Sequence, residues 1–502
     1  MAEKTENFLA ADFGASNGRI IAGEFNGQVL KFNEIHRFEN IPVYLDGTFY
    51  WDFLRLFHEL KTGISKADKM YKDIRSIGVE TWGCDFWLLD KNRELLSNPV
   101  HYRDRRTVGI AKELKSILPD REIYEMTQAQ IIEINTIYQL FAMKKNNSPV
   151  LESAEHMLLM GDLFNYFLTG NIICEYSNAT LTQLFNQRDK KWAGPIIDKL
   201  KLPPHIFKDV TSPGSIIGSL SKQVTTELGC KAFTVALPGY DTTSEITAIP
   251  VSMENCKKNW AYLNCGTWGM VGLISNYPVV TKEGFLNRFG NEGGVGNYYH
   301  FLKNMVCLWI IQQCRKKWNE EQKRVISWKE IDSLTENTPD RNIFIDVDDE
   351  VFEREIFNMP QCIISYCKGK NQDAPGNIGE ICRMFFESLA LKYLLNLKKL
   401  EMISGKKMEL LHMVGGGSNN KLLCQWISDA SGLSLIAGPP ETTTAGNLLA
   451  QLVAVKEIEN IDEAKEIMIN SVELAYYYPK KNMYGVWNQK FTKYLEILSL
   501  DV

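Results

Sequence analysis

Short apolar runs alternate with longer amphipathic segments along this chain, and this alternation constrains its fold more than any single motif. The opening reads as three apolar strands, FLAAD, GRIIAGEF and QVLKFNEIHRF, with an Asn26-Gly27 turn before the last. Helical spacing follows in WDFLRLFHELKTGISKA, and IRSIGVETWGCDFWLLD then reads as a strand, a glycine-containing turn and another strand. Strands and helices that alternate in this way predict an α/β fold.

The length of the chain predicts two domains. Its 502 residues, 45% hydrophobic and 23% charged, exceed what one hydrophobic core normally organises. Turn-forming residues gather between residues 211 and 257, in TSPGS, LPGYDTTSEI and SMENCKKN. We therefore expect one domain over residues 1–245 and a second over residues 246–502.

Composition argues against several classes of partner. The formal net charge is −5 and the sequence has no basic block, so a nucleic-acid partner is not expected. The start, MAEKTENF, lacks the apolar segment of a secretory signal, and no apolar run reaches the roughly 18 to 20 residues that span a bilayer. The 11 cysteines form no Cys-x-x-Cys pair. We expect a cytoplasmic protein without a membrane partner, zinc or disulfides.

Two similar strand-turn-strand segments stand in the two halves of the chain. The first, FLAADFGASNGRIIAGEF, places Asp12 beside a glycine-containing turn, and the second is WAYLNCGTWGMVGLI. Two such turns could hold one polyphosphate between them. Each turn taken alone is also compatible with a simple hairpin connection.

A third glycine-rich segment follows a long helical pattern. NIGEICRMFFESLALKYLLNLKKLEMISG predicts an amphipathic helix that packs in the core through Ile378, Ile381, Phe385, Leu389 and Leu395. MELLHMVGGGSNNKLLCQWISDASGLSLIAG then reads as strand, glycine loop, helix and strand.

This glycine loop is a candidate nucleotide site, because three consecutive glycines leave bare backbone beside a helix N-terminus. Ser418 or Asn419 is the expected N-cap, and Gly432 the residue just past the helix end. The loop matches neither a Walker A motif nor G-x-G-x-x-G. A purely structural helix entry is the alternative.

Two charged stretches remain open to more than one interpretation. Asp241 in GYDTTSE could accept a proton from an attacking hydroxyl, or could simply form an Asx-turn or cap a helix. In YRDRRT, Arg105 and Arg106 favour a solvated ion-pair surface over a network that supports a substrate site.

The ordered motifs together resemble the FGGY family of carbohydrate kinases over nearly the whole chain. The stretches that carry this resemblance are DFGASNGR, SIGVETWGCDFWLLD, PVHYRDRRT, YSNATLTQLFN, DTTS, CGTWGM, NEGGVGNYYHFLKNMVCLWIIQQC, HMVGGGSNNKLLCQWISDASG and AGPPETTTAGNLLAQL. The resemblance implies two RNase H-like (actin-like ATPase) domains, each a mixed sheet flanked by helices, with a catalytic cleft between them. It also implies transfer of the γ-phosphoryl group of ATP to a sugar hydroxyl.

The resemblance implies a role for each matching position. Asp12 would hold Mg²⁺ through water, and Asp241 would be the general base. The residues implied around ATP are Ala15, Ser16, Asn17, Gly18, Arg19, Thr267, Gln312, Gly416 and Asn420. The residues implied around the sugar are Gly83, Tyr240, Asp241, Thr242 and Asn304.

The implied acceptor is a small 6-deoxy-ketohexose, L-rhamnulose phosphorylated on its 1-hydroxyl, with L-fuculose or another ketose as the alternative. An actin-like ATP-binding protein and a nonenzymatic sugar sensor are alternatives of another class. The chain departs from the family at Tyr240, where histidine is usual, and at Cys265 and Gly269, where serines are usual. Family members are monomers or homodimers, and either is compatible with this sequence.

Overall fold

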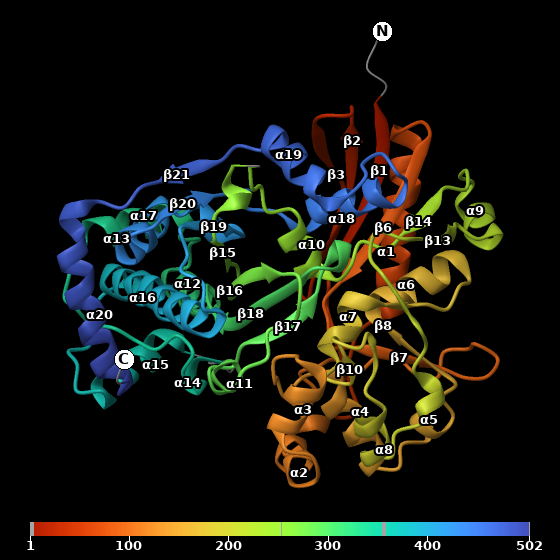
Figure 1. Ribbon diagram of the computed structural model, residues 1–502, viewed down its shortest axis with the longest axis horizontal. Coiled ribbons are helices and arrows are strands. Elements are labelled where there is room, and N and C mark those ends of the chain that lie inside the picture. Colours follow the sequence, from red (N-terminus) through yellow and green to blue (C-terminus); the bar gives the residue numbers. More distant parts are fainter. Residues whose placement is uncertain (1–4, 253, 354–357, 501–502) are drawn as a thin grey trace. The chain divides into compact units, whose positions relative to one another are not determined.

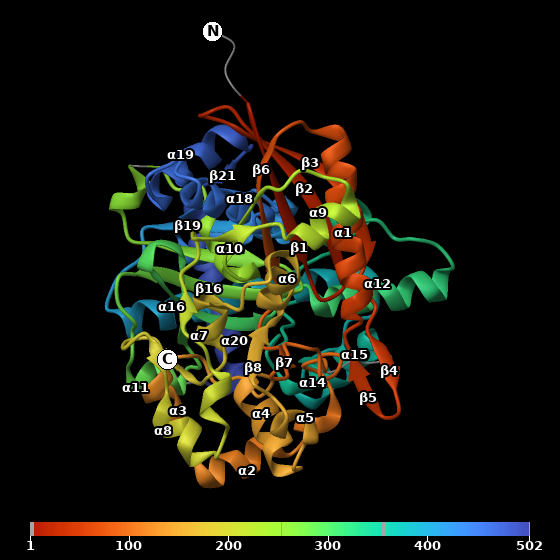
Figure 2. The ribbon, with the colours of Figure 1, turned by 90° about the vertical axis from the view of Figure 1, so that its right-hand side faces the viewer.

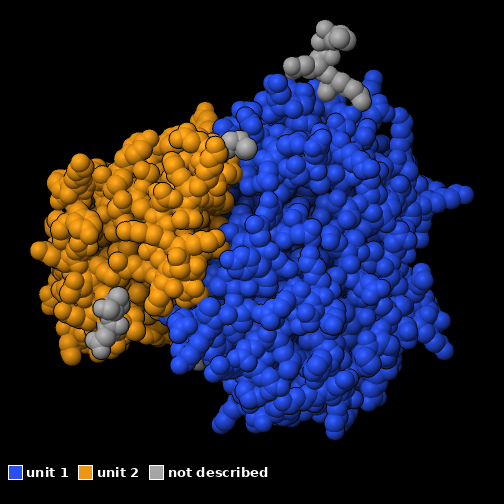
Figure 3. All heavy atoms as spheres, in the orientation of Figure 1, with its two compact units in different colours: residues 1–250, 274–301, 442–471 blue, residues 251–273, 302–441, 472–502 orange. Residues whose placement is uncertain are grey.

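The computed structural model describes residues 5–252, 254–353 and 358–500. The chain forms two compact units, which Figure 3 colours separately. The first comprises residues 1–250, 274–301 and 442–471, and the second residues 251–273, 302–441 and 472–502. Each unit is thus assembled from separated segments, whereas the sequence predicts one boundary after residue 245, and that domain boundary stays a prediction.

The first unit is built on a six-stranded sheet with the order β13-β14-β6-β1-β2-β3 (Figure 1). Its strands are β1 (Glu6–Phe13), β2 (Asn17–Phe25), β3 (Leu30–Glu39), β6 (Ile74–Thr81), β13 (Ile216–Ser219) and β14 (Thr234–Ala236). The first three strands form the antiparallel meander that the sequence predicts, and β6 runs parallel to β1 and β14.

Helices cover both faces of this sheet because its central strands are apolar on both sides. Leu9, Ala11 and Phe13 of β1 join the core under α1 (Phe53–Met70) and α6 (Met160–Thr169). Figure 2 shows α1 alongside β2 and β3, which it contacts. Side chains alternate along a strand, so Asp12 shares the opposite face of β1 with Phe8 and Ala10.

The face that bears Asp12 carries α10 (Asp241–Thr247) and α18 (Thr443–Ala454). Gln451 of α18 donates to the Leu9 carbonyl (2.8 Å), and Asn447 donates to the Gly78 carbonyl (3.1 Å). A Cβ on Gly78 would collide with the Asn447 side chain. These bonds fix α18, and through it α10, on the sheet.

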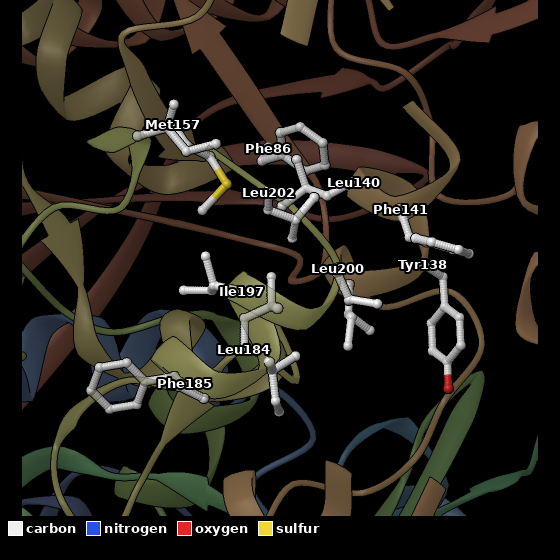
Figure 4. Close-up of a cluster of buried hydrophobic side chains, with 14 of the residues drawn as sticks. Phe86, Tyr138, Leu140, Phe141, Met157, Leu184, Phe185, Ile197, Leu200 and Leu202 are labelled. Atoms are coloured by element: carbon white, nitrogen blue, oxygen red, sulfur yellow. The ribbon is translucent and has the colours of Figure 1, made fainter. Parts of the chain in front are cut away.

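A second core lies in the first unit around residues 86–207, and Figure 4 shows its side chains. It packs short elements that carry several loops of the candidate site. Its elements are β7 (Phe86–Leu89), α2 (Ile110–Ile117), α3 (Asp120–Thr127), α4 (Thr136–Lys145), α5 (Pro149–Glu152), β8 (His156–Leu159), β9 (Cys174–Glu175), α7 (Tyr176–Leu181), β10 (Phe185–Asn186), β11 (Lys191–Trp192) and α8 (Gly194–Lys199).

The remaining elements of the first unit are short or peripheral. They are β4 (Val43–Leu45), β5 (Thr48–Tyr50), β12 (Val210–Thr211), α9 (Lys222–Leu228), α11 (Lys282–Leu286), β17 (Gly290–Gly293) and α19 (Ile461–Ser471).

The second unit contains most of a seven-stranded sheet with the order β17-β18-β16-β15-β19-β20-β21. Its further strands are β15 (Trp260–Cys265), β16 (Trp268–Ser275), β18 (Tyr299–Val306), β19 (Leu410–Val414), β20 (Ser434–Ala437) and β21 (Ala475–Tyr477). The antiparallel pair β15 and β16 followed by parallel β19 and β20 repeats the pattern of β1, β2, β6 and β14. The similarity of the two strand-turn-strand segments therefore extends to the sheets around them.

The helices of the second unit surround one long central helix. They are α12 (Trp309–Gln322), α13 (Trp328–Asn337), α14 (Glu350–Glu353), α15 (Met359–Gly369), α16 (Ile378–Ser404), α17 (Lys421–Ser431) and α20 (Tyr484–Leu498). The amphipathic prediction for α16 is wrong, because every side chain from Met384 to Leu397 is buried. A helix that is buried on all sides belongs to the middle of a core.

Candidate active site

The first predicted phosphate turn joins β1 to β2 and is held at its base. The Gly14 N–H donates to the Asn17 carbonyl at 2.9 Å. Asn40 donates its side-chain amide to the Gly14 carbonyl (2.9 Å) and its backbone N–H to the Ser16 carbonyl (3.0 Å). Ser16 and Asn17 are exposed, so the tip of the turn remains accessible to a ligand.

Gly18 is one of the residues that the resemblance implies around ATP. In the structure Gly18 is buried in β2, and a Cβ there would collide with the Phe38 ring. The position therefore needs glycine for packing.

Asp12 and Arg19 form an ion pair at the sheet end of this turn. Both the Nε and the Nη2 atoms of Arg19 lie 2.9 Å from Oδ2 of Asp12. Burial raises the pKa of Asp12, and the positive charge of Arg19 offsets only part of that rise. Both of these Arg19 contacts go to Oδ2 of Asp12.

Asp241 begins α10 on the same side of the sheet. Its Oδ1 atom accepts from the backbone N–H of Thr242 at 2.6 Å. Burial raises the pKa of Asp241 to about 7, and the negative charge of Asp12 contributes in the same direction. The structure thus brings Asp12 and Asp241 close enough to interact electrostatically.

Glu80 is a third carboxyl group in this region, and the sequence analysis did not select it. It pairs in register with Asp12 across β1 and β6 and is fully buried. Burial raises the pKa of Glu80 well above its usual value, and the charges of Asp12 and Asp241 add to the rise. The signal in the sequence is an acidic residue inside the apolar run SIGVETW.

The predicted sugar residues of the first unit lie together. A Cβ on Gly83 would be 3.6 Å from the Tyr240 ring and 3.5 Å from Oδ1 of Asn178. Tyr240 precedes Asp241 directly, and Thr242 follows it, with its hydroxyl 3.3 Å from Oδ1 of Asp241. Gly83, Tyr240, Asp241 and Thr242 therefore border one small region.

Two residues of this region are missing from the predicted set. Asn178, on α7, is 3% exposed, and its Oδ1 atom has no hydrogen-bond partner among the described residues. Glu292, on β17, is 4% exposed and accepts a short hydrogen bond from the Tyr240 hydroxyl. Both stand in motifs quoted for the resemblance, YSNATLTQLFN and NEGGVGNYYH, but only the fold brings them to Tyr240.

A buried carboxylate supports the loop that carries Gly83. Asp85 accepts from the indole N–H groups of Trp51 (2.6 Å) and Trp82 (3.0 Å) and from the Gln139 amide (3.0 Å). Burial raises the pKa of Asp85 to about 6, although these donors lower it. The network holds both residues that flank the Gly83-Cys84 turn.

Arg106 takes part in this network, which corrects the prediction of a solvated ion pair. It is half-buried and donates to Oε1 of Gln139 at 2.5 Å. Arg105 is exposed, as predicted for the surface alternative. The two adjacent arginines differ because Arg106 alone turns toward the core around Phe86.

In the second unit, the turn between β15 and β16 contacts the start of α12. The Thr267 hydroxyl donates to Oε1 of Gln312 at 3.3 Å, and the Trp309 N–H donates to the Thr267 carbonyl at 3.2 Å. Thr267 and Gln312, both predicted at the nucleotide, are therefore neighbours.

The glycine loop after β19 packs against the same turn. A Cβ on Gly417 would collide with the Cys265 side chain, and Gly415 has φ +82° beside the Cys265 backbone. A Cβ on Gly416 would meet nothing within 4 Å, so this glycine presents bare backbone to open space. Cys265 itself is fully buried under the loop and fills space there.

The helix after this loop starts later than predicted. A 3-10 turn over Gly416–Asn419 comes first, and the N-cap of α17 is Asn420, which accepts from the Leu423 N–H at 2.8 Å. The prediction of Ser418 or Asn419 as N-cap is therefore wrong. Gly432 ends the helix with φ +72°, as predicted.

The Asn420 side chain has two partners in the protein. Besides accepting from the Leu423 N–H, it donates to Asp332 at 2.9 Å.

The last predicted residue, Asn304, lies on β18 in the second unit.

Comparisons with known proteins identify the family. Residues 7–246 match the N-terminal domain and residues 261–455 the C-terminal domain of the FGGY family of carbohydrate kinases. The chain belongs to this family, and the resemblance predicted from the sequence is confirmed. It is an ATP-dependent carbohydrate kinase.

Individual relatives are similar over nearly their full length. A rhamnulokinase of Oceanobacillus iheyensis is 37% identical over 479 residues, covering 95% of this chain and 99% of the relative. A rhamnulokinase of Bacteroides thetaiotaomicron is 35% identical over 476 residues, covering 95% and 96%. The rhamnulokinase of Bacillus subtilis is 33% identical over 476 residues, covering 94% and 95%.

Solved structures share the fold at low identity. A ligand-bound xylulose kinase from Lactobacillus acidophilus has a TM-score of 0.82 at 15% identity and covers 98% of each chain. A glycerol kinase from Plasmodium falciparum with ADP has a TM-score of 0.76 at 14% identity and covers 99% of each chain. The predicted α/β fold class is confirmed. No helix within the described ranges has the length and apolar character needed to cross a membrane.

Proposed function

We propose that this kinase phosphorylates the 1-hydroxyl of L-rhamnulose and forms L-rhamnulose 1-phosphate and ADP. The observation that carries the proposal is the similarity to rhamnulokinases, at 33% to 37% identity over nearly whole chains. L-Fuculose, a stereoisomer, is the second candidate, because Tyr240 stands where the family usually has histidine. A phenol has another length and other hydrogen-bonding properties than an imidazole.

Asp241 is the proposed general base. Its carboxylate accepts the proton of the sugar 1-hydroxyl as that oxygen attacks the γ-phosphorus of ATP, and the bond to the leaving ADP breaks. A pKa of about 7 suits this task, because a base works best when its pKa lies near the operating pH. Tyr240, Thr242 and Gly83, with Asn304 of β18, are the proposed sugar contacts.

Asp12 is the proposed ligand of Mg²⁺, through water. The donor set fits a hard cation, because a carboxylate oxygen is the type of ligand that magnesium prefers. The metal would neutralise charge on the phosphates. Arg19 orients the Asp12 carboxylate and adds a positive charge beside it.

The remaining proposed contacts bind ATP. In the first unit they are Ala15, Ser16, Asn17, Gly18 and Arg19, of which Ser16 and Asn17 form the exposed tip of the turn. In the second unit they are Thr267, Gln312, Gly416 and Asn420. Gly416 fits this role because its backbone faces open space. Phosphoryl transfer depends mostly on positioning and charge neutralisation, which these groups supply.

The proposal extends to the setting of the enzyme. Residues 1–245 and 246–502 would be its N- and C-terminal domains. We propose a cytoplasmic monomer or homodimer, because ATP is supplied in the cytoplasm and the acceptor is a small ketose.

An ADP-release assay coupled to NADH oxidation tests the substrate. Purified protein with ATP and Mg²⁺ is offered L-rhamnulose, L-fuculose, L-ribulose, L-xylulose, D-xylulose and glycerol in parallel. The highest kcat/KM with L-rhamnulose supports the proposal. A clear preference for L-fuculose would replace the substrate and keep the kinase, and omission of Mg²⁺ must abolish turnover.

A further inference from the structure

Tyr240 is held at both ends by buried groups. Its backbone N–H donates to the Ser177 hydroxyl at 3.1 Å, and Ser177 in turn donates to Glu175 at 2.7 Å. Its phenol O–H donates to Oε2 of Glu292. The ring is 5% exposed and lies against Gly83. Tyr240 therefore cannot change its direction without breaking buried hydrogen bonds.

Glu292 is fixed just as firmly by its neighbours in the NEGG segment. The backbone of the next residue, Gly293, is hydrogen-bonded on both sides. Its N–H donates to the Thr180 hydroxyl at 2.9 Å, and its carbonyl accepts from the Thr243 hydroxyl at 2.8 Å. A Cβ on Gly293 would collide with the Tyr176 ring. Strand β17, which carries the Glu292 carboxylate, is thus tied through Gly293 to α7 and to α10, the two helices of the candidate sugar region.

The single hydroxyl hydrogen of Tyr240 is used in the hydrogen bond to Glu292. The phenol O–H donates to Oε2 of Glu292, and a phenol has a single hydrogen to donate. Burial and the negative charge of Glu292 raise the pKa of Tyr240, so the phenol keeps this hydrogen near neutral pH. What remains on the phenol oxygen for a ligand is its lone pairs.

We propose that Glu292 is a positioning residue that sets the polarity of sugar recognition. By taking the Tyr240 hydrogen, it makes the phenol oxygen an acceptor, so that a hydroxyl group of the ketose must donate to it. The inference rests on the proposed function and adds to it. It distinguishes this chain from relatives with histidine before the base, because a neutral imidazole can present a donor at the same place.

Three variants and a set of substrate analogues test the inference. Glu292→Gln places both an amide donor and a carbonyl acceptor beside the phenol. The phenol can then either donate or accept a hydrogen bond there, so its oxygen is no longer restricted to accepting from the sugar. Tyr240→Phe removes the phenol oxygen, and the double variant removes the pair. Tyr166→Phe on α6 is the matched control, because it removes only an exposed hydrogen bond from the Tyr166 hydroxyl to the Arg93 carbonyl. KM for the ketose, KM for ATP and kcat are measured for each, with thermal unfolding as the check on folding.

We expect Glu292→Gln and Tyr240→Phe each to raise KM for the ketose by about tenfold, the loss of one good hydrogen bond. KM for ATP stays unchanged, and the double variant adds little to either single change because both act on one contact. Tyr166→Phe matches the wild type. A merely structural role of Glu292 would change both KM values or the folding midpoint instead.

Deoxy and fluoro ketoses give a second readout that does not depend on Glu292→Gln folding. In each analogue one hydroxyl of the ketose is replaced by hydrogen or by fluorine, and neither substituent can donate a hydrogen bond. At the carbon whose hydroxyl donates to Tyr240, both the deoxy and the fluoro analogue should therefore lose about tenfold in kcat/KM with the wild type. That loss should disappear in Tyr240→Phe. The inference is overturned if the two single effects multiply, if Glu292→Gln leaves KM for the ketose unchanged, or if no carbon shows this pattern. Failure of the wild type to phosphorylate any ketose would instead refute the proposed function.

Discussion

Replacing Gly446 with alanine tests whether α10 needs its close contact with α18 to hold Asp241. A Cβ at Gly446 would fall well inside contact distance of the Ser244 carbonyl oxygen on α10, three residues after Asp241. Non-bonded carbon and oxygen atoms need about 3.5 Å, so the helices must separate by roughly 2 Å at this contact. A displacement of only about 1 Å at a reacting group already lowers the rate by about 100-fold.

The same substitution changes stability in two opposing ways. Alanine gains about 1 kcal/mol over glycine inside a helix, whereas overpacking costs about 1 to 3 kcal/mol. The net effect is a loss of up to about 2 kcal/mol in the free energy of unfolding. The matched control is Gly485→Ala on α20, where a Cβ meets nothing within 4 Å.

The assay is coupled ADP release for kcat, with thermal unfolding measured on the same preparations. We expect Gly446→Ala to lose both kcat and thermal stability, and Gly485→Ala to keep kcat and unfold at the same or a slightly higher temperature. Wild-type kcat together with wild-type unfolding in Gly446→Ala would refute the reasoning, because α10 would then be free of this contact.

Three further predictions concern other parts of the site. The kcat/KM of the wild type for the ketose should fall as the pH drops through about 7, because Asp241 must be ionised to accept a proton and its pKa in the free enzyme is raised to about 7. A flat pH profile of kcat/KM would contradict this. Thr267→Val removes the hydroxyl that contacts Gln312 at 3.3 Å and should raise KM for ATP by about tenfold, with KM for the ketose unchanged. Trp51→Phe removes the indole N–H that donates to buried Asp85 at 2.6 Å and should lower the free energy of unfolding by about 1 to 3 kcal/mol. Chemical unfolding would show this as a lower denaturation midpoint. An unchanged midpoint would mean that the other donors satisfy Asp85 without Trp51.

The elements of the fold could be predicted where periodicity is strong. The β1–β3 meander, α1, and the segment from β19 to β20 follow from apolar spacing and glycine turns. The all-round burial of α16 could not, because periodicity indicates only which side chains are apolar and α16 is covered by several other helices. The N-cap at Asn420 was missed because a 3-10 turn stands before the helix.

The candidate site was predictable only where a motif names its own residues. Asp12, Gly83 and Asp241 stand in recognisable stretches, and the fold brings these three into the same unit. Glu292 is distant in sequence from Tyr240. The two meet only because β17 packs beside α7 and Ser177 of α7 binds the Tyr240 N–H. The spacing of residues along the sequence does not predict the contact between Tyr240 and Glu292.

The most direct test of the central claim is the turnover of Asp241→Asn with L-rhamnulose, measured beside its affinity for ADP. The asparagine keeps the shape of the side chain but cannot take up the sugar proton. We predict a loss of kcat by about 100-fold to 10,000-fold, with ADP binding retained, since general-base catalysis contributes that much. Undiminished turnover in this variant would contradict the role of Asp241 on which the account depends.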